Sequence, residues 1–263
     1  MAQKYKVGDV GISNAGSEFK IIADLKTEGF LVEFQDSWKF CRVFQKYAVN
    51  RGNIWNPYHP TIFGVGYFGV GKYSARVGKE VGKDKRNTKE YNAWINMLQR
   101  CYYDKYICRT DGYKIYDKVK VCNEWHNFQT FAEWYTPRLE ALQHLNERRY
   151  HLDKDILSKG LTDKIYSPET CCVIPMRINA VLINVDSKLN KTSLFKGVHK
   201  KKSSYAAICS VEGAANYSGG FNTAEEAAKE YIIMKKVNLT KLADEYKVVL
   251  EPKVYDALKS YLD

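Results

Sequence analysis

Residues 150–175, YHLDKDILSKGLTDKIYSPETCCVIP, decide how the centre of this chain folds. They predict two short strands, LDKDIL and CCVIP, joined by a loop that turns at YSP, because Pro168 fixes its own φ and Ser167 can hydrogen-bond locally. The next stretch, MRINAVLIN, predicts a helix that carries Asn179. This order of elements brings Asp153 of the first strand near Asn179, a layout that can clasp one divalent cation.

Three charged residues, Asp153, Lys154 and Asp155, stand in a row between aliphatic neighbours. Such flanks predict a partly buried position, where each charge needs a partner. Carboxylate and amide oxygens suit Mg²⁺ or Mn²⁺ rather than zinc, so the aspartates are candidate metal ligands. The same residues can instead form an ion-pair cluster that steadies a small core. The residues alone leave both interpretations open.

The N-terminal region, residues 1–58, predicts a small β-barrel of the SH3-like type. Four short strand patterns, VGDVGIS, FKIIADL, FLVEFQD and WKFCRVF, are separated by the turn-forming stretches NAGSE, KTEG and QDS. Their spacing is that of hairpins. The pattern does not indicate a function for this region.

A glycine-rich, basic linker is expected over residues 59–86. Its GVGYFGVGKY stretch lacks the GxxxxGK[ST] order of a phosphate-binding loop. We expect Lys83, Lys85 and Arg86 to follow a phosphate backbone. A solvated basic linker without a dedicated partner is the alternative.

Two helices are expected early in the central region, residues 87–186. The pattern of one begins at Thr88, and a second begins near Phe128 and should pack on the first. The apolar face of the first helix comprises Tyr91, Trp94, Ile95, Leu98 and Cys101.

The net charge points to a polyanionic partner. The formal charge is +11 and the pI is about 9.1. Nucleic acid is therefore the first candidate, and a lysine-rich soluble protein without such a partner is the alternative.

The cysteine usage and hydropathy favour a reduced, cytoplasmic protein with no membrane partner. The seven cysteines are scattered, which fits a compartment that keeps thiols reduced. No apolar leader is recognisable and no apolar run approaches the ~20 residues that cross a bilayer. A structural Zn²⁺ is not favoured because no CxxC pair is present. The residues considered for such a zinc site are Cys101, Cys122, His126 and Cys171.

The central region resembles the HNH-type, homing-endonuclease-like proteins of bacteriophages. The resemblance covers roughly residues 87–186 and rests on the ordered series YNAWINMLQRCYY, YDKVKVCNEWHNFQTFAEWY, LDKDI and YSPETCCVIPMRIN. It implies a ββα-metal fold, metal-dependent cleavage of DNA by Mg²⁺ or Mn²⁺, and a bacterial host cytoplasm. The ligand position of the first strand falls on Asp153 and that of the helix on Asn179, with Asp155 as a further candidate ligand.

The catalytic base of the HNH family is where this chain departs from the pattern. Lys154 stands at the general-base histidine position, and Thr170 stands where the family has the asparagine that orients this base. Lysine has an unperturbed pKa near 10.4, so we expect Lys154 to grip a phosphate rather than to deprotonate water. His151 is the nearest substitute base, on the opposite face of the strand from Lys154.

The C-terminal region, residues 193–237, resembles the plant ethylene-response-factor (APETALA-type) DNA-binding domain, which phage HNH proteins also contain. The resemblance rests on FKGVHKKKSSYAAICS and ANYSGGFNTAEEAAKEY. It implies a three-stranded sheet that lies in the major groove of double-stranded DNA, with a helix on its other face. Thr223 and Glu226 form a capping-box pattern at the start of this helix. A helical tail, residues 238–263, has Pro252 suited to a first turn.

The sheet residues implied to bind DNA are a cationic run and two tyrosines at positions where the family has tryptophans. Ile208 and Ser210 replace an acidic residue and an arginine of the family's second strand, so phosphate binding is better supported than base-specific reading. The implied DNA-binding residues are Lys196, His199, Lys200, Lys201, Lys202, Tyr205 and Tyr217. The helix face expected against the sheet comprises Ala227, Ala228, Tyr231, Ile232 and Val237.

The sequence thus predicts an α+β protein with a small N-terminal β-barrel, an HNH-like ββα-metal centre, and a C-terminal three-stranded sheet packed on a helix. The expected function is metal-dependent nicking of double-stranded DNA. One alternative is a DNA-binding or regulatory protein on an HNH scaffold that has lost catalysis. Another is a protein whose basic surface engages a second protein. The sequence indicates no oligomeric state.

Overall fold

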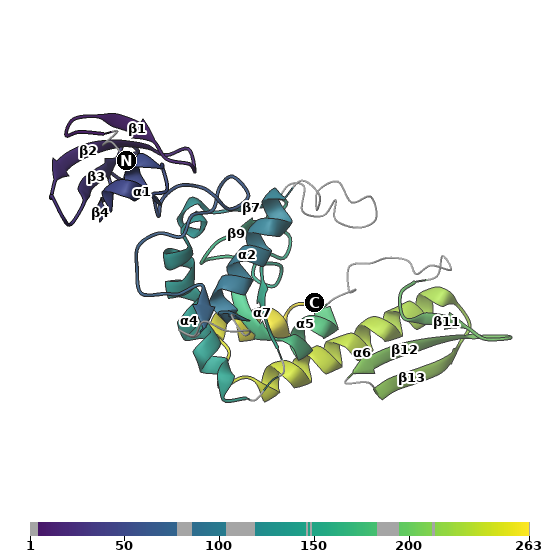
Figure 1. The fold of residues 1–263 in the computed structure, drawn as a ribbon. Coiled ribbons are helices and arrows are strands. Elements are labelled where there is room, and N and C mark those ends of the chain that lie inside the picture. Colours follow the sequence, from purple (N-terminus) through teal and green to yellow (C-terminus); the bar gives the residue numbers. More distant parts are fainter. Residues whose placement is uncertain are drawn as a thin grey trace. The chain divides into compact units, whose positions relative to one another are not determined.

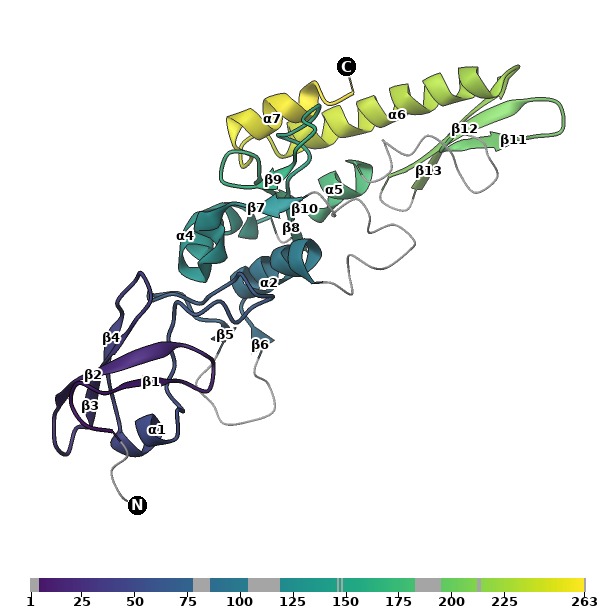
Figure 2. The same ribbon diagram turned by 90° about the horizontal axis from the view of Figure 1, so that it is seen from above.

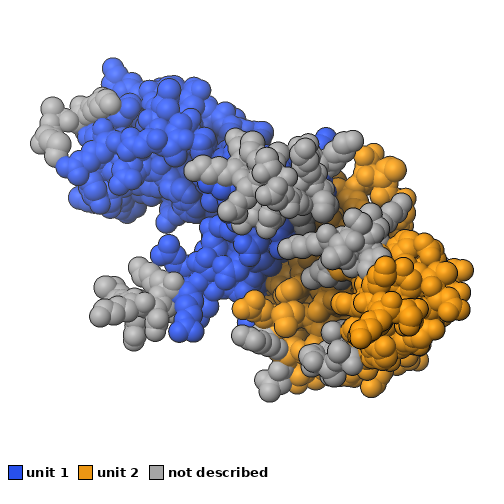
Figure 3. Space-filling model, turned by 90° about the vertical axis from the view of Figure 1, so that its right-hand side faces the viewer, with its two compact units in different colours: residues 1–133 blue, residues 134–263 orange. Residues whose placement is uncertain are grey.

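The structure is a computed structural model of the 263-residue chain. It describes residues 5–77, 86–103, 119–145, 147, 149–182, 195–211 and 214–262. The chain forms two compact units, residues 1–133 and 134–263 (Figure 3). The boundary between them falls inside helix α4 (Phe128–Gln143).

Unit 1 begins with an antiparallel sheet of four strands in the order β1-β2-β3-β4 (Figure 1). The predicted strands are confirmed, but the predicted barrel is wrong because the sheet is open. Its outer strands have three and four residues, and closing a barrel requires the outer strands to pair with each other. The elements of this region are β1 (Val10–Ile12), β2 (Glu18–Asp24), β3 (Phe30–Phe34), β4 (Cys41–Phe44) and α1 (Lys46–Asn50).

Alternate residues of β2 and β3 form the core of this sheet. Phe19 and Ile21 of β2 are fully buried, as are Phe30 and Val32 of β3. They pack with Val49 of α1. Side chains two residues apart share one face of a strand, so the pattern buries one face of the sheet under the helix.

Helix α2 (Lys89–Tyr102) begins where the sequence predicts, because the Thr88 hydroxyl accepts a hydrogen bond from the Tyr91 N–H at 3.2 Å. Trp94 packs on Phe128, with ring centres 5.4 Å apart, and its indole donates to the Trp125 carbonyl at 2.7 Å. The predicted packing between these helices is therefore confirmed. The remaining elements of unit 1 are β5 (Arg76–Val77), β6 (Arg86–Asn87), β7 (Lys120–Val121) and the 3₁₀ helix η2 (Asn123–His126).

Unit 2 contains the predicted strand, loop, strand and helix. Strand β8 (Tyr150–Asp153) pairs antiparallel with β10 (Cys172–Pro175), and α5 (Met176–Leu182) follows β10 directly. The loop between the strands includes the short strand β9 (Ile165–Tyr166). We call β8, β10 and α5 the ββα unit. Its first strand is shorter than predicted, since it ends at Asp153 instead of continuing through Leu157.

The C-terminal sheet is formed by β11 (Val198–Lys200), β12 (Tyr205–Val211) and β13 (Ala214–Phe221), in that order. Helix α6 (Ala224–Glu245) covers one face (Figures 1 and 2). The predicted capping box is confirmed, because the Thr223 and Glu226 side chains each accept the other residue's backbone N–H. This part of the fold follows directly from local sequence signals.

Helix α6 extends beyond the C-terminal sheet and joins a second apolar cluster. Tyr231 packs on the sheet, while Leu239 and Leu242 pack with α5 and with α7 (Pro252–Lys259), which begins at the predicted proline. The expected burial of Ile232 and Val237 is wrong, since they are 38% and 60% exposed. Each step along a helix turns the side chain by about 100°, so a residue next to Tyr231 points away from the sheet.

No helix within the described ranges is long and apolar enough to cross a membrane.

Gly197 and Gly160 both have a positive φ and form a matched pair for testing how tightly α6 packs on the sheet. A β-carbon at Gly197 (φ +73°) would come within 2.1 Å of the Tyr231 ring, whereas Gly160 (φ +83°) has open space within 4 Å. Gly160→Ala should lower the free energy of unfolding by about 1–2 kcal/mol, the backbone cost alone. Gly197→Ala should lose about 1–3 kcal/mol more from overpacking. Equal losses in urea unfolding would contradict this packing.

Candidate nucleic-acid interface and ββα unit

The C-terminal sheet has one face against α6 and one open face. Alternation along β12 turns Ala207 and Cys209 toward Tyr231 of α6, and all three side chains are buried. Ile208 lies between them on the opposite face and pairs across the sheet with Tyr217 of β13. Small and apolar residues therefore hold the helix on one side, and the exposed Tyr217 lies on the other.

Tyr217 forms an aromatic platform on the open face. Its side chain is 58% exposed. It lies over Gly219, because a β-carbon there would come within 2.2 Å of the Tyr217 hydroxyl. The Lys201 ammonium is 5.6 Å from the ring centre, a distance at which a cation and an aromatic face attract. The open face thus presents a ring and a cation side by side.

The lysine run lies at the tip of the hairpin between β11 and β12. His199 and Lys200 belong to β11, and Lys201 and Lys202 follow it in the turn. All four side chains are exposed. Tyr205 is half-buried at the start of β12, opposite Lys200. The structure therefore brings most of the predicted DNA-binding residues to one end of the sheet.

Lys196 and the linker residues are placed differently. Lys196 is half-buried just before β11. Burial lowers the pKa of Lys235 on α6, and the charge of Lys196 adds to this lowering, so the two lysines are near enough to interact. Arg86 is exposed in β6 of unit 1. Lys83 and Lys85 lie outside the described residues. The predicted phosphate contacts by these three linker residues stay a prediction.

The ββα unit brings His151 and Asn179 together. Across the two strands His151 pairs with Ile174 and Asp153 pairs with Cys172. Ile174 and Cys172 are buried in the cluster that includes α5, so His151 and Asp153 face this helix. The Asn179 Nδ2 lies 2.7 Å from the His151 Nδ1. In this orientation the amide donates to the ring, which places the ring proton on Nε2.

The Asp153 carboxylate ends β8. Its Oδ1 accepts the backbone N–H groups of Asp155 at 2.8 Å and Ile156 at 2.9 Å. These bonds turn the chain after Asp153, which explains why the strand stops there. Burial raises the pKa of Asp153, and the two backbone hydrogen bonds offset this only in part.

Lys154 and Asp155 form the ion-pair cluster considered as the alternative to a metal site. The Lys154 Nζ is 2.9 Å from both carboxylate oxygens of Asp155 and 5.8 Å from the Tyr166 ring centre. Lys164 pairs with the same carboxylate. Burial acts to raise the pKa of Asp155, but the two lysines outweigh it and the pKa is lowered. The Lys154 side chain is only 3% exposed, so it is almost inaccessible to a phosphate group in solution.

Thr170 organises the loop before β10. Its hydroxyl accepts the Ser167 N–H at 3.1 Å, and the Cys171 N–H donates to the Ser167 carbonyl at 3.0 Å. Ser167 also donates from its hydroxyl to Glu169 at 2.7 Å. These bonds confirm the turn predicted at YSP and give Thr170 a role within the loop.

The three predicted metal ligands do not fit a divalent-ion site in this arrangement. Asp153 accepts two backbone amides, Asp155 holds two lysines, and Asn179 contacts His151. Among the described residues, no three or more His, Cys, Asp or Glu side chains are grouped to hold a metal ion. The four residues considered for zinc all lie within the described ranges.

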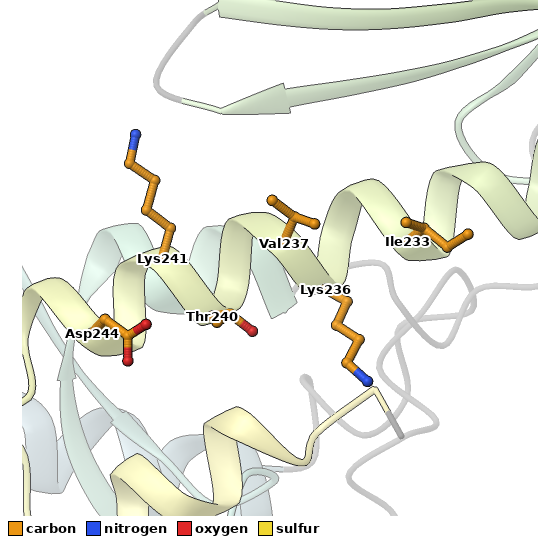
Figure 4. A pocket seen from close by; sticks show the side chains of 6 residues that line it. All are labelled: Ile233, Lys236, Val237, Thr240, Lys241 and Asp244. Atoms are coloured by element: carbon orange, nitrogen blue, oxygen red, sulfur yellow. The ribbon is translucent and has the colours of Figure 1, made fainter.

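A shallow groove runs along the exposed side of α6 (Figure 4). In Figure 4, Val237 and Lys241 point to one side of the helix and Lys236 points to another. The groove combines apolar groups with charges of both signs, so its composition identifies no ligand. Its lining residues are Ile233, Lys236, Val237, Thr240, Lys241 and Asp244.

One residue of interest was not singled out from the sequence. Gly219 supports the Tyr217 ring, and its only signal was the GG pair in YSGGF, which is also typical of a turn. His151 was named from the sequence as the nearest substitute base, but its hydrogen-bond partner was not predicted. Its contact with Asn179 joins residues 28 positions apart and depends on how α5 packs on β8.

The role of Asp153 can be tested by removing its negative charge. The folded-state pKa is raised, so ionised Asp153 destabilises the fold at neutral pH, and this cost disappears as the pH falls through the folded-state pKa. Asp153→Asn keeps an oxygen acceptor without the charge. We expect it to be more stable than wild type at pH 7, with a difference that closes on acidification. Asp153→Ala should lose about 1–3 kcal/mol at every pH, because two backbone donors lose their acceptor.

Urea unfolding of the three proteins from pH 7 downward measures these differences. An Asp153→Asn variant as unstable at pH 7 as Asp153→Ala would show that the negative charge itself is needed, and would favour a bound cation.

Comparisons with known proteins identify no relative of this chain. No family model, no curated protein and no solved structure matches the chain. The function must therefore be argued from the open face of the C-terminal sheet and from the ββα unit.

Proposed function

We propose that the protein binds double-stranded DNA through the open face of its C-terminal sheet. The observation that carries the proposal is the Tyr217 platform with the lysine run beside it. Lys201 lies next to the ring, and its chain neighbours Lys200 and Lys202 are exposed in the same hairpin tip. The other face of the sheet is covered by α6, so the sheet has one surface to offer.

Physical chemistry supports a phosphate-directed mode of binding. Lysine ammonium groups neutralise phosphates and release the counterions condensed on the duplex, which favours association at low salt. Ile208 on the open face has no group that hydrogen-bonds a base edge. We therefore propose that the lysines set the affinity and that base-specific reading by β12 is limited.

Replacing Lys200, Lys201 and Lys202 together with alanine tests this proposal. The slope of log K against log salt should become shallower by up to about 2.7, which is 0.9 for each lost phosphate contact. The control is a triple alanine variant of Lys229, Lys236 and Lys241, which are exposed on α6. It removes the same number of positive charges. Its slope should stay close to wild type.

Gel-shift titrations of one duplex at several salt concentrations give both slopes. Equal losses in the two triple variants would mean that only net charge matters, and the sheet would no longer be the proposed interface.

Cleavage of the bound DNA by the ββα unit is a second candidate function. The contact between Asn179 and His151 favours it. Rotating the Asn179 amide by 180° would let its oxygen accept from Nδ1–H and leave the His151 Nε2 as a base. The buried ion pair of Lys154 weighs against that residue as the base. Without such a base the ββα unit would act as a scaffold for a DNA-binding protein.

Nicking of supercoiled plasmid separates cleavage from binding alone. Wild-type protein would be compared with His151→Ala in Mg²⁺, in Mn²⁺ and in EDTA, with exposed His144→Ala as the matched control. If the ββα unit cleaves DNA, His151→Ala should slow nicking by about 10²–10⁴-fold, the usual contribution of a general base, while His144→Ala should not. Tight DNA binding without nicking by wild type in any of the three conditions would remove the cleavage function and leave the binding proposal intact.

A further inference from the structure

Unit 1 exposes an aromatic stack whose outer ring is Trp38. Trp38 lies in the connection between β3 and β4, and its side chain is 52% exposed. Its ring is nearly parallel to that of Tyr58, with centres 4.5 Å apart and planes 7° apart. Tyr67 lies at the edge of the stack, about 6 Å from each ring centre. One face of the indole is therefore covered by tyrosine.

Hydrogen bonds between two separate loops hold this stack in place. The Asp36 carboxylate accepts the backbone N–H groups of Trp38 at 3.0 Å and Lys39 at 3.2 Å, and the Asn56 amide at 2.6 Å. The Asn56 oxygen accepts the Tyr58 N–H at 3.0 Å. Asn56 is buried, at 2% exposure, whereas the bonds from Asp36 to the Trp38 and Lys39 backbone lie at the surface. Together these hydrogen bonds fix the backbone of both stacked residues.

The chemistry of the stack limits what can bind it. The rings of Trp38 and Tyr58 are in contact, so they leave no gap in which a cation could lie between two aromatic walls. The neighbouring acid, Asp36, already accepts three hydrogen bonds. The neighbouring cation is exposed Lys39, which follows Trp38 in the chain at a positive φ of 48°. Its ammonium donates to the Gln35 side-chain oxygen at 3.3 Å, in an exposed contact. An exposed flat ring with a surface lysine next in the chain suits a flat, uncharged group attached to an anion.

We propose that Trp38 is a stacking site for an unpaired base of a DNA strand, with Lys39 near the adjoining phosphate. Base stacking on an exposed aromatic ring tolerates any sequence, because every base has a π-face. The site is separate from the duplex interface on the C-terminal sheet and does not depend on it. It gives unit 1, whose sheet pattern indicated no function, a role in holding single-stranded DNA.

Binding of a short oligothymidylate tests the stacking site. Trp38→Ala should weaken binding by about 5- to 150-fold at fixed salt, the loss typical of one stacked base. Trp38→Phe keeps a ring and should lose less. Trp55→Ala is the matched control, since Trp55 is a 45% exposed tryptophan of the same unit, and it should bind like wild type. All four proteins should bind duplex DNA equally.

Crosslinking to an oligonucleotide that contains 5-bromodeoxyuridine tests the site in the wild-type protein, without relying on a variant that folds. Irradiation should join the base to the peptide that contains Trp38. Equal oligothymidylate affinity of the Trp38→Ala and Trp55→Ala variants would overturn the proposal, as would crosslinks confined to other peptides. Binding of a trimethyl-lysine or polyproline peptide at Trp38 in place of oligothymidylate would also overturn it.

Discussion

Unit 2 depends on one constraint, which is that α6 must bury two apolar surfaces at once. Tyr231, in its N-terminal half, packs on the C-terminal sheet, and Leu239 and Leu242, in its C-terminal half, pack with α5 and α7. Fully burying each leucine contributes about 1.5–3 kcal/mol. Between these contacts the buried Lys235 donates to the Val181 carbonyl of α5 at 2.7 Å. The helix runs unbroken through residues 237–238, where the sequence suggested a domain boundary, so both clusters share one element.

Local signals predicted much of the fold because they act within a few residues. The hydroxyls of Thr88 and Thr223 cap helices, and Pro252 starts one, without help from the rest of the chain. The four N-terminal strands were recognisable for the same reason. Barrel closure was not, because it depends on whether β1 and β4 meet, and strand patterns carry no information on that contact.

The candidate site was harder to predict because its residues have competing partners. Asp153 can bind an ion or the backbone amides that follow it, and the sequence is the same in both cases. Lys154 was expected to bind a phosphate, but it is buried and pairs with Asp155. The Trp38 stack depends on Asp36 and Asn56, which are 20 positions apart. Such contacts arise only after the elements have packed.

The lysine run has a further physical effect that requires no ligand. Strand β11 lies at the edge of the C-terminal sheet, and an edge strand presents unpaired backbone groups to which another chain can add. This strand has only three residues, and it ends in Lys200, with two more lysines after it. Short edge strands flanked by lysine resist pairing between copies, because like charges repel as two such edges approach. The cations at the hairpin tip therefore also oppose pairing between copies at this edge of the sheet.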